Sequence, residues 1–358
     1  MTAKILHQFN DTITPGDAIT DHTFLLQSWL RQWGFTSDVY ALHIDASLND
    51  RVKPYHTYKP RKNETHLIYH HSTGSELVPT LTTQYPHLRH IMIYHNITPP
   101  QFFVGLQPAL IAQLQLGRQQ LPQLLPHTTL ALGDSPYNQL ELQQLGFPHT
   151  GVLPLPLDPH QYDYPLNTTL QTKFATADPL LLFLGRIVPN KCQADLIKLL
   201  YYYRQIRPNA QLLIVGKPWL PPYVNWIEEL IRRLGLQDAV HFPGHVSFAD
   251  MATYYQIADL YISMSEHEGL GKPLLESMYL GTPVLAYASS AVPSTVDTGG
   301  ILFHHKHYPA LAELVDLMIY DQQLNHKLIA NGRSRVQHFL PTNVQKTLSQ
   351  YLTHLNLK

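Results

Sequence analysis

Two glutamates, Glu268 and Glu276, stand eight positions apart, and the stretch Gly269-Leu270-Gly271 directly follows the first. Carboxylates only accept hydrogen bonds, so a pair of them suits a ligand rich in hydroxyl groups. Glycine has no Cβ, which lets the backbone N–H groups of Gly269, Leu270 and Gly271 approach a ligand closely. A helix that begins beyond such a loop adds partial positive charge for an anion. This stretch therefore predicts a site for a ligand with both hydroxyl groups and negative charge.

The surrounding pattern predicts the elements that position these residues. Asp259–Met264 and Thr282–Tyr287 are short apolar runs typical of buried strands. Pro273 suits the first turn of a helix, and Gly281 is placed to end that helix. A strand, loop, helix and second strand in this order indicate a parallel sheet, so we expect an α/β protein.

With the flanking Pro273, Gly281 and Pro283, the two glutamates resemble the E-x7-E signature of family 4 retaining glycosyltransferases. The resemblance implies the GT-B fold, in which two Rossmann-like domains with parallel sheets face each other across a cleft. It also implies that Glu268 faces the donor sugar and that Glu276 holds the nucleotide ribose, while Gly269, Leu270 and Gly271 lie against the donor. The alternative is a solvated helix face, which is where most glutamates lie.

A second motif begins another predicted sheet. The apolar run Pro179–Leu184 precedes Gly185-Arg186, and Lys191 follows after a short loop. Two cations so placed can converge on one diphosphate. The string GRIVPNK resembles the donor-diphosphate motif of the same family. Gly216, at the end of the next predicted strand, is a further donor-binding candidate. The resemblance implies that the segment after the strand beyond it, at Val246, presents backbone to the nucleotide base, so the identity of the base cannot be read.

The amino-terminal half begins with a predicted strand at Lys4–Phe9, a loop at Asn10–Asp17 and a helix at about Thr20–Trp33. It lacks the G-x-G-x-x-G pattern of a Rossmann dinucleotide site. Gly16 and Asp17 match the place where the resembling family sets a glycine against the donor phosphates. For Asp17 the alternative of a loop residue or helix cap stays open.

Two further predicted strands, His66–His71 and Ile91–His95, both end in histidine. Open α/β sheets place ligands at the carboxyl ends of their strands, although a histidine at a strand end is usually structural. The strings IYHHSTGS and IYHNITPPQFF resemble a bacterial surface-polysaccharide branch of the family, in which the histidine at position 95 lies beside the donor sugar. We therefore include His95 among the catalytic candidates, and we place His71 and His70 behind it.

The resemblance implies three segments. Residues 1–157 form an acceptor-side domain, residues 158–340 form a donor-side domain, and residues 341–358 form a helix that crosses back to the first domain. Val344, Leu348, Leu352 and Leu355 lie on one face of this last helix. Phe102–Leu125 is predicted to be helical with a break at Pro108, and it either packs on the core or receives a lipid-linked acceptor.

Composition excludes several classes of function. Lys and Arg number 25 against 26 Asp and Glu, which leaves no basic excess to bind a nucleic acid. Cys192 is the single cysteine, so neither an internal disulfide nor a cysteine zinc site is expected. We see no signal peptide and no run long enough to span a bilayer. We expect a cytoplasmic protein, with the inner face of a membrane as a further expectation.

The sequence thus predicts an enzyme, a retaining hexosyltransferase of polysaccharide biosynthesis. It would move a hexose-type sugar from a nucleotide-diphosphate donor to a glycan or lipid-linked acceptor, with no cofactor and no metal. The resemblance implies that the leaving diphosphate takes the acceptor's proton and that Arg186 and Lys191 stabilise its charge. Lys272 departs from the apolar residue usual before Pro273, and it is either a phosphate contact or solvated. A phosphorylase of the same fold and a silent nucleotide-sugar sensor remain alternatives.

Overall fold

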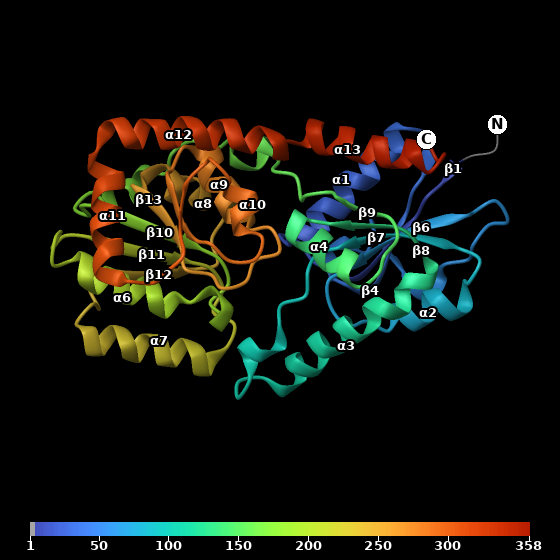
Figure 1. The fold of residues 1–358 in the computed structure, drawn as a ribbon, viewed down its shortest axis with the longest axis horizontal. Coiled ribbons are helices and arrows are strands. Elements are labelled where there is room, and N and C mark those ends of the chain that lie inside the picture. Colours follow the sequence, from blue (N-terminus) through green and yellow to red (C-terminus); the bar gives the residue numbers. More distant parts are fainter. Residues whose placement is uncertain (1–3) are drawn as a thin grey trace. The chain divides into compact units, whose positions relative to one another are not determined.

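The computed structural model describes residues 4–358, which divide into two compact units (Figure 1). Unit 1 contains the chain up to Gln101 together with Pro108–Pro156 and Pro341–Lys358, and unit 2 contains Phe102–Gln107 and Leu157–Leu340. Residues 102–107 were expected in the first domain. They belong to unit 2, where the ring of Phe103 packs edge-on against Trp219 with centroids 6.4 Å apart.

In unit 1, from Lys4 onward, a parallel sheet has the strand order β5-β4-β2-β6-β7-β8-β9. Its strands are β2 (Gln8–Ile13), β4 (Val39–Ile44), β5 (Lys53–Pro54), β6 (His66–His71), β7 (Arg89–Tyr94), β8 (Thr128–Gly133) and β9 (Thr150–Val152). A separate parallel pair joins β1 (Lys4–Ile5) to β3 (Phe35–Thr36). Chain order reverses between β2 and β6, which makes this pair the switch point of the sheet.

The prediction of a loop at Asn10–Asp17 was wrong for residues 10–13, because β2 continues to Ile13. Polar residues at the strand's centre misled the sequence interpretation. Asn10 is only 1% exposed, and its Oδ1 accepts a hydrogen bond from the Thr23 hydroxyl at 3.2 Å. Paired on both sides by β4 and β6, the strand tolerates this polar residue, whose side-chain oxygen has its partner inside the protein.

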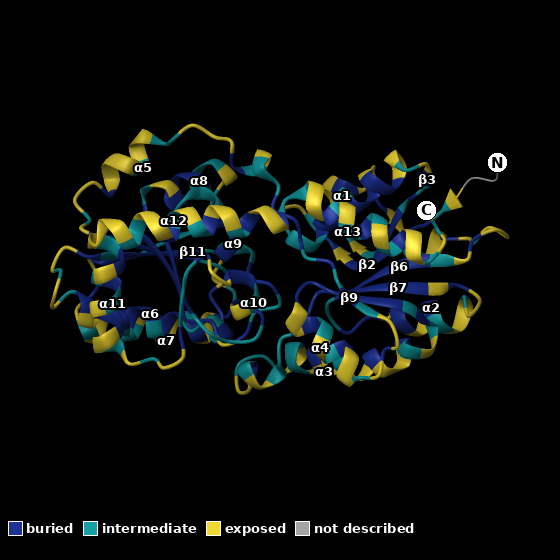
Figure 2. Ribbon diagram, turned by 45° about the horizontal axis from the view of Figure 1, so that its top comes forward, coloured by how far each residue is buried: buried dark blue, intermediate teal, exposed yellow. Residues whose placement is uncertain are grey.

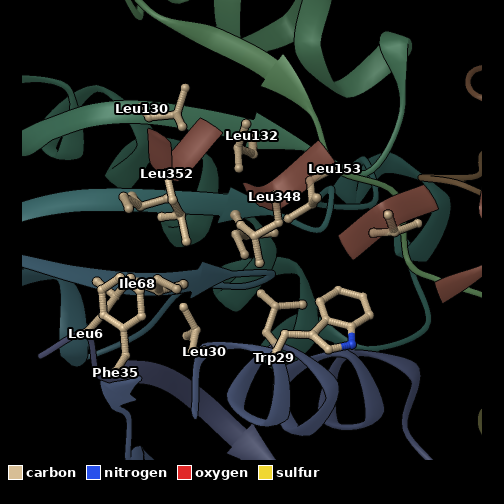
Figure 3. Packing of buried hydrophobic residues seen from close by; sticks show 14 residues of the cluster. Leu6, Trp29, Leu30, Phe35, Ile68, Leu130, Leu132, Leu153, Leu348 and Leu352 are labelled. Carbon is tan, nitrogen blue, oxygen red and sulfur yellow. The ribbon is translucent and has the colours of Figure 1, made fainter. Parts of the chain in front are cut away.

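Helices flank the sheet of unit 1 (Figure 1). They are α1 (Ala18–Gln32), α2 (Leu77–Gln84), α3 (Pro108–Leu124), α4 (Pro136–Gln144) and α13 (Pro341–His354). Figure 3 shows the core on one face of the sheet, where Trp29 and Leu30 of α1 and Leu348 and Leu352 of α13 meet strand residues such as Leu132. The last helix is therefore an integral part of unit 1. Gly151 of β9 confirms how tightly it packs, because a Cβ there would lie 2.3 Å from the Tyr351 hydroxyl oxygen.

The sheet of unit 2 is also parallel and, within the described residues, has the order β12-β11-β10-β13-β14-β15. Its strands are β10 (Leu180–Leu184), β11 (Gln211–Val215), β12 (Val240–Gly244), β13 (Leu260–Ser263), β14 (Val284–Tyr287) and β15 (Ile301–Phe303). The strands are largely buried, whereas the surrounding helices alternate buried and exposed faces (Figure 2). This alternation is typical of helices that cover a sheet.

The helices of unit 2 are α5 (Thr168–Lys173), α6 (Gln193–Tyr203), α7 (Pro221–Leu234), α8 (Phe248–Ile257), α9 (Lys272–Leu280), α10 (Val292–Val296), α11 (Tyr308–Tyr320) and α12 (Gln322–Val336). The predicted bounds of α9 are confirmed, since Pro273 lies in its first turn and Gly281 caps it with φ 87°. The predicted two-sheet α/β fold is confirmed as well. No helix formed by residues 4–358 is both long enough and apolar enough to cross a bilayer.

The core shared with α13 gives the first prediction. Leu348→Ala should lower the free energy of unfolding of unit 1 by about 2–5 kcal/mol, because a fully buried leucine leaves a cavity. Hydrogen exchange followed by mass spectrometry should show faster exchange in peptides of α1 and β8, with peptides of β10 unchanged. Leu140→Ala is the matched control, since this leucine of α4 is 52% exposed. Equal effects of the two substitutions would contradict the packing described.

Candidate functional site

The sheet of unit 2 reverses its chain order between β10 and β13, its two central strands. In open α/β sheets, ligands bind outside the carboxyl ends of the strands at such a switch point. The loop after β10 carries Arg186 and Lys191, and the loop after β13 carries Glu268. The switch point therefore brings together residues predicted from two separate motifs.

A direct ion pair connects these two loops. Lys191 Nζ lies 2.6 Å from Glu268 Oε1, and the two side chains are only 21% and 12% exposed. The pair is thus partly shielded from water, which strengthens it relative to a surface pair. A ligand bound at this edge would meet an ammonium and a carboxylate side by side.

Backbone hydrogen bonds fix the same two loops. The Glu266 N–H donates to the Asn190 carbonyl at 2.8 Å, and Asn190 Nδ2 donates to the His267 carbonyl at 3.2 Å. On the other side, the Glu268 N–H donates to Ser290 Oγ at 2.7 Å. Glu268 is therefore held from both directions before any ligand arrives.

The glycine loop ends where α9 begins. Gly271 occupies the N-cap with φ 85°, a backbone conformation that favours glycine, and a Cβ there would lie 2.7 Å from Leu274 Cδ1. Leu270 is buried, and its carbonyl accepts a hydrogen bond from Thr295 Oγ1 at 2.6 Å. The loop from Gly269 to Gly271 thus leads into the helix N-terminus, where partial positive charge favours an anion. Lys272, the first residue of α9, has its Nζ 3.4 Å from Gln161 Oε1.

Glu276 lies inside α9 with 4% exposure, and two tyrosines hold its carboxylate. The Tyr162 hydroxyl donates to Oε1 at 2.7 Å, and the Tyr255 hydroxyl donates to Oε2 at 2.8 Å. Burial, followed by the charge of Glu276, raises the pKa of Tyr255 well above its ordinary value, so this tyrosine keeps its donor proton. The carboxylate is oriented in advance, and each oxygen retains a lone pair for a ligand.

Arg186 is exposed and lies over an aromatic ring. Its guanidinium carbon is 5.5 Å from the centroid of Trp219, and its carbonyl accepts a hydrogen bond from Gln193 Nε2 at 2.9 Å. Gly216 directly follows β11, and a Cβ at this position would lie 2.0 Å from the Gly185 carbonyl oxygen. The ends of β10 and β11 therefore approach each other more closely than any side chain would allow.

Val246 follows β12 and is half-buried, directly before Ser247, which caps α8. All nine predicted residues of unit 2 thus lie in α9 or in the loops at the carboxyl edge of its sheet: Arg186, Lys191, Gly216, Val246, Glu268, Gly269, Leu270, Gly271 and Glu276. Sequence reasoning missed Tyr162 and Tyr255. They lie 114 and 21 positions from Glu276, and no local motif marks them.

Gly16, Asp17 and His95 belong to unit 1. Gly16 has φ 74°, and Asp17 caps α1 by accepting hydrogen bonds from the backbone N–H groups of Ile19 and Thr20 at 3.0 and 3.1 Å. The capping alternative for Asp17 is therefore confirmed, and roles for Gly16 and Asp17 toward a donor stay predictions.

The ring of His95 is enclosed by protein. Its side chain is 1% exposed, with Nδ1 3.0 Å from Asp134 and Nε2 2.9 Å from His70 Nδ1. His71 Nε2 donates a hydrogen bond to the Gly117 carbonyl oxygen at 3.0 Å. Because both ring nitrogens of His95 face protein atoms, a contact between His95 and a donor sugar stays a prediction.

Among residues 4–358, two groups of three side chains each bring atoms that could bind a metal within 4.8 Å of one another: Cys192, Asp195 and Glu266 in unit 2, and His22, His70 and His95 in unit 1. In the first group the ammonium of Lys306 already pairs with both carboxylates, at 2.8 Å from each. This cation supplies the charge that a metal ion would bring.

Comparisons with known proteins find a family model and several relatives. A sequence model of the family "Glycosyl transferases group 1" matches residues 169–335. A GDP-mannose-dependent monoacylated alpha-(1-6)-phosphatidylinositol monomannoside mannosyltransferase of Corynebacterium glutamicum is 30% identical over 174 residues, which cover 46% of this chain and 44% of that enzyme. An alpha-monoglucosyldiacylglycerol synthase of Streptococcus pneumoniae is 32% identical over 186 residues, which cover 48% of this chain and 41% of the synthase. The chain thus spans less than half the length of these curated relatives.

Solved structures resemble the whole chain. The Alr3699/HepE protein of Anabaena, in complex with UDP and glucose, superposes with a TM-score of 0.78 at 19% identity and covers 98% of this chain and 100% of its own. A sucrose-phosphate synthase of Thermosynechococcus elongatus gives a TM-score of 0.77 at 19% identity, covering 98% and 99%. Residues 169–335 therefore match the glycosyl transferases group 1 family model, and the chain has the GT-B fold of these solved structures.

Proposed function

We propose that this chain is a retaining glycosyltransferase that moves a hexose-type sugar from a nucleotide-diphosphate donor to a glycan or lipid-linked acceptor. The observation that carries the proposal is the arrangement on β13 and α9. Glu276 is held between two tyrosyl hydroxyls, and Glu268 pairs with Lys191 from the neighbouring loop. Two oriented carboxylates beside a cation and a helix N-terminus match a ligand with sugar hydroxyls at both ends and a diphosphate between them.

In the proposed reaction, the bond between the anomeric carbon of the sugar and the diphosphate oxygen breaks. The acceptor hydroxyl oxygen bonds to that carbon on the face the diphosphate leaves, so configuration is retained. The acceptor's proton passes to a phosphate oxygen. Arg186, Lys191 and the backbone N–H groups of Gly269–Gly271 stabilise the negative charge that grows on the leaving diphosphate. Because these groups supply positive charge themselves, we propose that no metal is needed.

The comparisons support the substrate classes. One relative is named for a GDP-mannose donor, and structural neighbours were solved with UDP or UDP-glucose. Both relatives described above carry lipids in their names, which favours a lipid-linked acceptor at a membrane surface. We propose a role in polysaccharide biosynthesis on this basis, together with the two histidine-ended strands that resemble surface-polysaccharide enzymes.

A panel of UDP-, GDP- and dTDP-sugars tests the proposal. Mass spectrometry should detect donor hydrolysis or transfer with one or a few donors, and NMR of the product should show the anomeric configuration of the donor. Turnover that requires free phosphate would indicate a phosphorylase instead. Binding of a donor without hydrolysis or transfer, over the full panel and with glycan acceptors present, would indicate a sensor.

Glu276→Gln should weaken donor binding. A charged hydrogen bond to ribose is worth about 1.5–3 kcal/mol, so the dissociation constant for the nucleoside diphosphate should rise roughly tenfold to a hundredfold. Calorimetry measures the change. Glu228→Gln is the matched control, because Glu228 lies exposed on α7. An unchanged affinity in folded Glu276→Gln would remove this residue from the donor site.

Arg186→Lys should lose turnover although it keeps its charge, because a planar guanidinium can hold two phosphate oxygens at once and an ammonium cannot. A contact made chiefly in the transition state affects kcat, and we expect the kcat of Arg186→Lys to fall by about tenfold or more. EDTA should leave the wild type active, and magnesium should not restore the variant. The exposed Arg233→Lys on α7 serves as control. Collapse of wild-type activity in EDTA would show that the diphosphate is stabilised in another way.

A further inference from the structure

A second cluster of charged side chains lies in unit 2, and the proposed reaction does not use it. Lys306 follows β15, the edge strand of the sheet, and its ammonium lies 2.8 Å from a carboxylate oxygen of Asp195 and 2.8 Å from one of Glu266. Asp195 lies in the first turn of α6, which follows β10, and Glu266 lies in the loop after β13. One lysine therefore joins segments that follow three different strands.

The two carboxylates belong to the same two segments as the central ion pair of the candidate site. Asp195 comes four residues after Lys191, and Glu266 comes two residues before Glu268. The segments are thus connected twice by charge. The first connection is the direct pair of Lys191 and Glu268 at 2.6 Å, and the second passes through the ammonium of Lys306.

Neighbouring tyrosines direct this ammonium to its place. It lies over the ring of Tyr287 in β14, 4.8 Å from the centroid, and the face of an aromatic ring attracts a cation. The Tyr308 hydroxyl donates to Asp195 Oδ1 at 2.8 Å, while the other oxygen, Oδ2, accepts from Lys306. The two oxygens of Asp195 are therefore divided between two donors, which fixes the direction in which Lys306 approaches.

The members of the cluster are charged at neutral pH. The side chains of Lys306 and Asp195 are only 15% and 16% exposed. Burial acts against the charge of Lys306, but hydrogen bonds to Asp195 and Glu266 outweigh it and raise the pKa of the ammonium above its ordinary value. Burial also acts against the charge of Asp195, but hydrogen bonds from Lys306 and Tyr308 lower the pKa of this carboxyl. Glu266 is 46% exposed, so water solvates its charge.

Without the ammonium, the two carboxylates would push their segments apart. An oxygen of Asp195 and one of Glu266 lie within 4.8 Å of each other, and like charges at this distance repel. The ammonium donates to both oxygens and turns the repulsion into attraction. Lys198 also pairs with Asp195, at 3.3 Å, but it is 40% exposed and lies on the same helix, so this second pair holds no other segment in place.

We infer that Lys306 is a positioning residue of the candidate site. By neutralising the repulsion between Asp195 and Glu266, it holds the loop of Glu268 against the loop of Lys191. As far as turnover is concerned, the inference rests on the proposed function. There Lys306 sets the place of the carboxylate that faces the sugar and of the ammonium that meets the leaving diphosphate, and it acts through the two segments rather than on the donor itself.

A single and a double substitution test this inference without any substrate. In Lys306→Met the repulsion is unopposed, so the protection of the amides of residues 264–271 against hydrogen exchange should fall about tenfold or more. Lys306→Met/Glu266→Gln removes the repulsion as well, and its protection should return to within about threefold of the wild type. Glu266→Gln alone should change protection little, because Lys306 keeps its pair with Asp195. Mass spectrometry of peptides from this segment measures the exchange.

Two further variants serve as controls. Lys306→Arg should retain protection and turnover, because a guanidinium can donate to two carboxylates. Lys198→Met removes a cation from the same Asp195 on the more exposed side and should leave the protection of residues 264–271 unchanged. The kcat for transfer or donor hydrolysis should follow protection, with a fall of about tenfold in Lys306→Met and recovery in the double variant. EDTA is present throughout, so that no metal ion replaces the ammonium.

Unchanged protection of residues 264–271 in Lys306→Met would overturn the inference, and so would a double variant no better protected than the single one. Lost protection with unchanged kcat would show that Lys306 does not position the site. If Lys306→Met does not fold, a folded double variant supports the inference, and a double variant that also fails to fold overturns it. Protection is measured without donor, so a lack of turnover in the wild type would count against the proposed function, while exchange still decides whether Lys306 holds the loop.

Discussion

Parallel strand direction is the constraint on which the rest of this structure depends. Every strand of the two main sheets ends at the same edge of its sheet, so each loop that follows a strand is delivered to that edge. In unit 2 the chain continues from β10 to β11 on one side of the sheet and from β13 to β14 on the other side. The loops after β10 and β13 therefore diverge, and the space between them stays uncovered. The ion pair from Lys191 to Glu268 spans that reversal, and it joins two motifs that are far apart in sequence.

Local motifs predicted the part of the site that backbone geometry controls. Pro273 and Gly281 set the ends of α9 because one lacks an N–H and the other tolerates positive φ, and neither property depends on distant residues. Apolar runs such as Pro179–Leu184 also located the strands, because this signal lies in the local sequence and does not depend on distant residues. The alternation of such runs with helical segments predicted an α/β protein with parallel sheets, and the resemblance implied its two domains.

What the sequence did not reveal depends on contacts between distant segments. Tyr162 and Tyr255 reach Glu276 only because the fold brings them there, and a tyrosine in isolation carries no signal for this role. The central residues of β2 were read as a loop, since the polarity of Asn10 is explained only by its partner on α1. His95 was assigned to a ligand edge by its place at a strand end. The fold adds Asp134 and His70, which occupy both of its ring nitrogens.

The place of α13 in unit 1 has a consequence for how the chain is made. A ribosome delivers Leu348 and Leu352 only after all of residues 157–340, although these leucines complete a core that begins at Leu6. Unit 2 can therefore fold during synthesis as one continuous stretch, apart from residues 102–107, while unit 1 still has part of one apolar sheet face uncovered. Most of unit 1 is made first, yet its hydrophobic core is completed last.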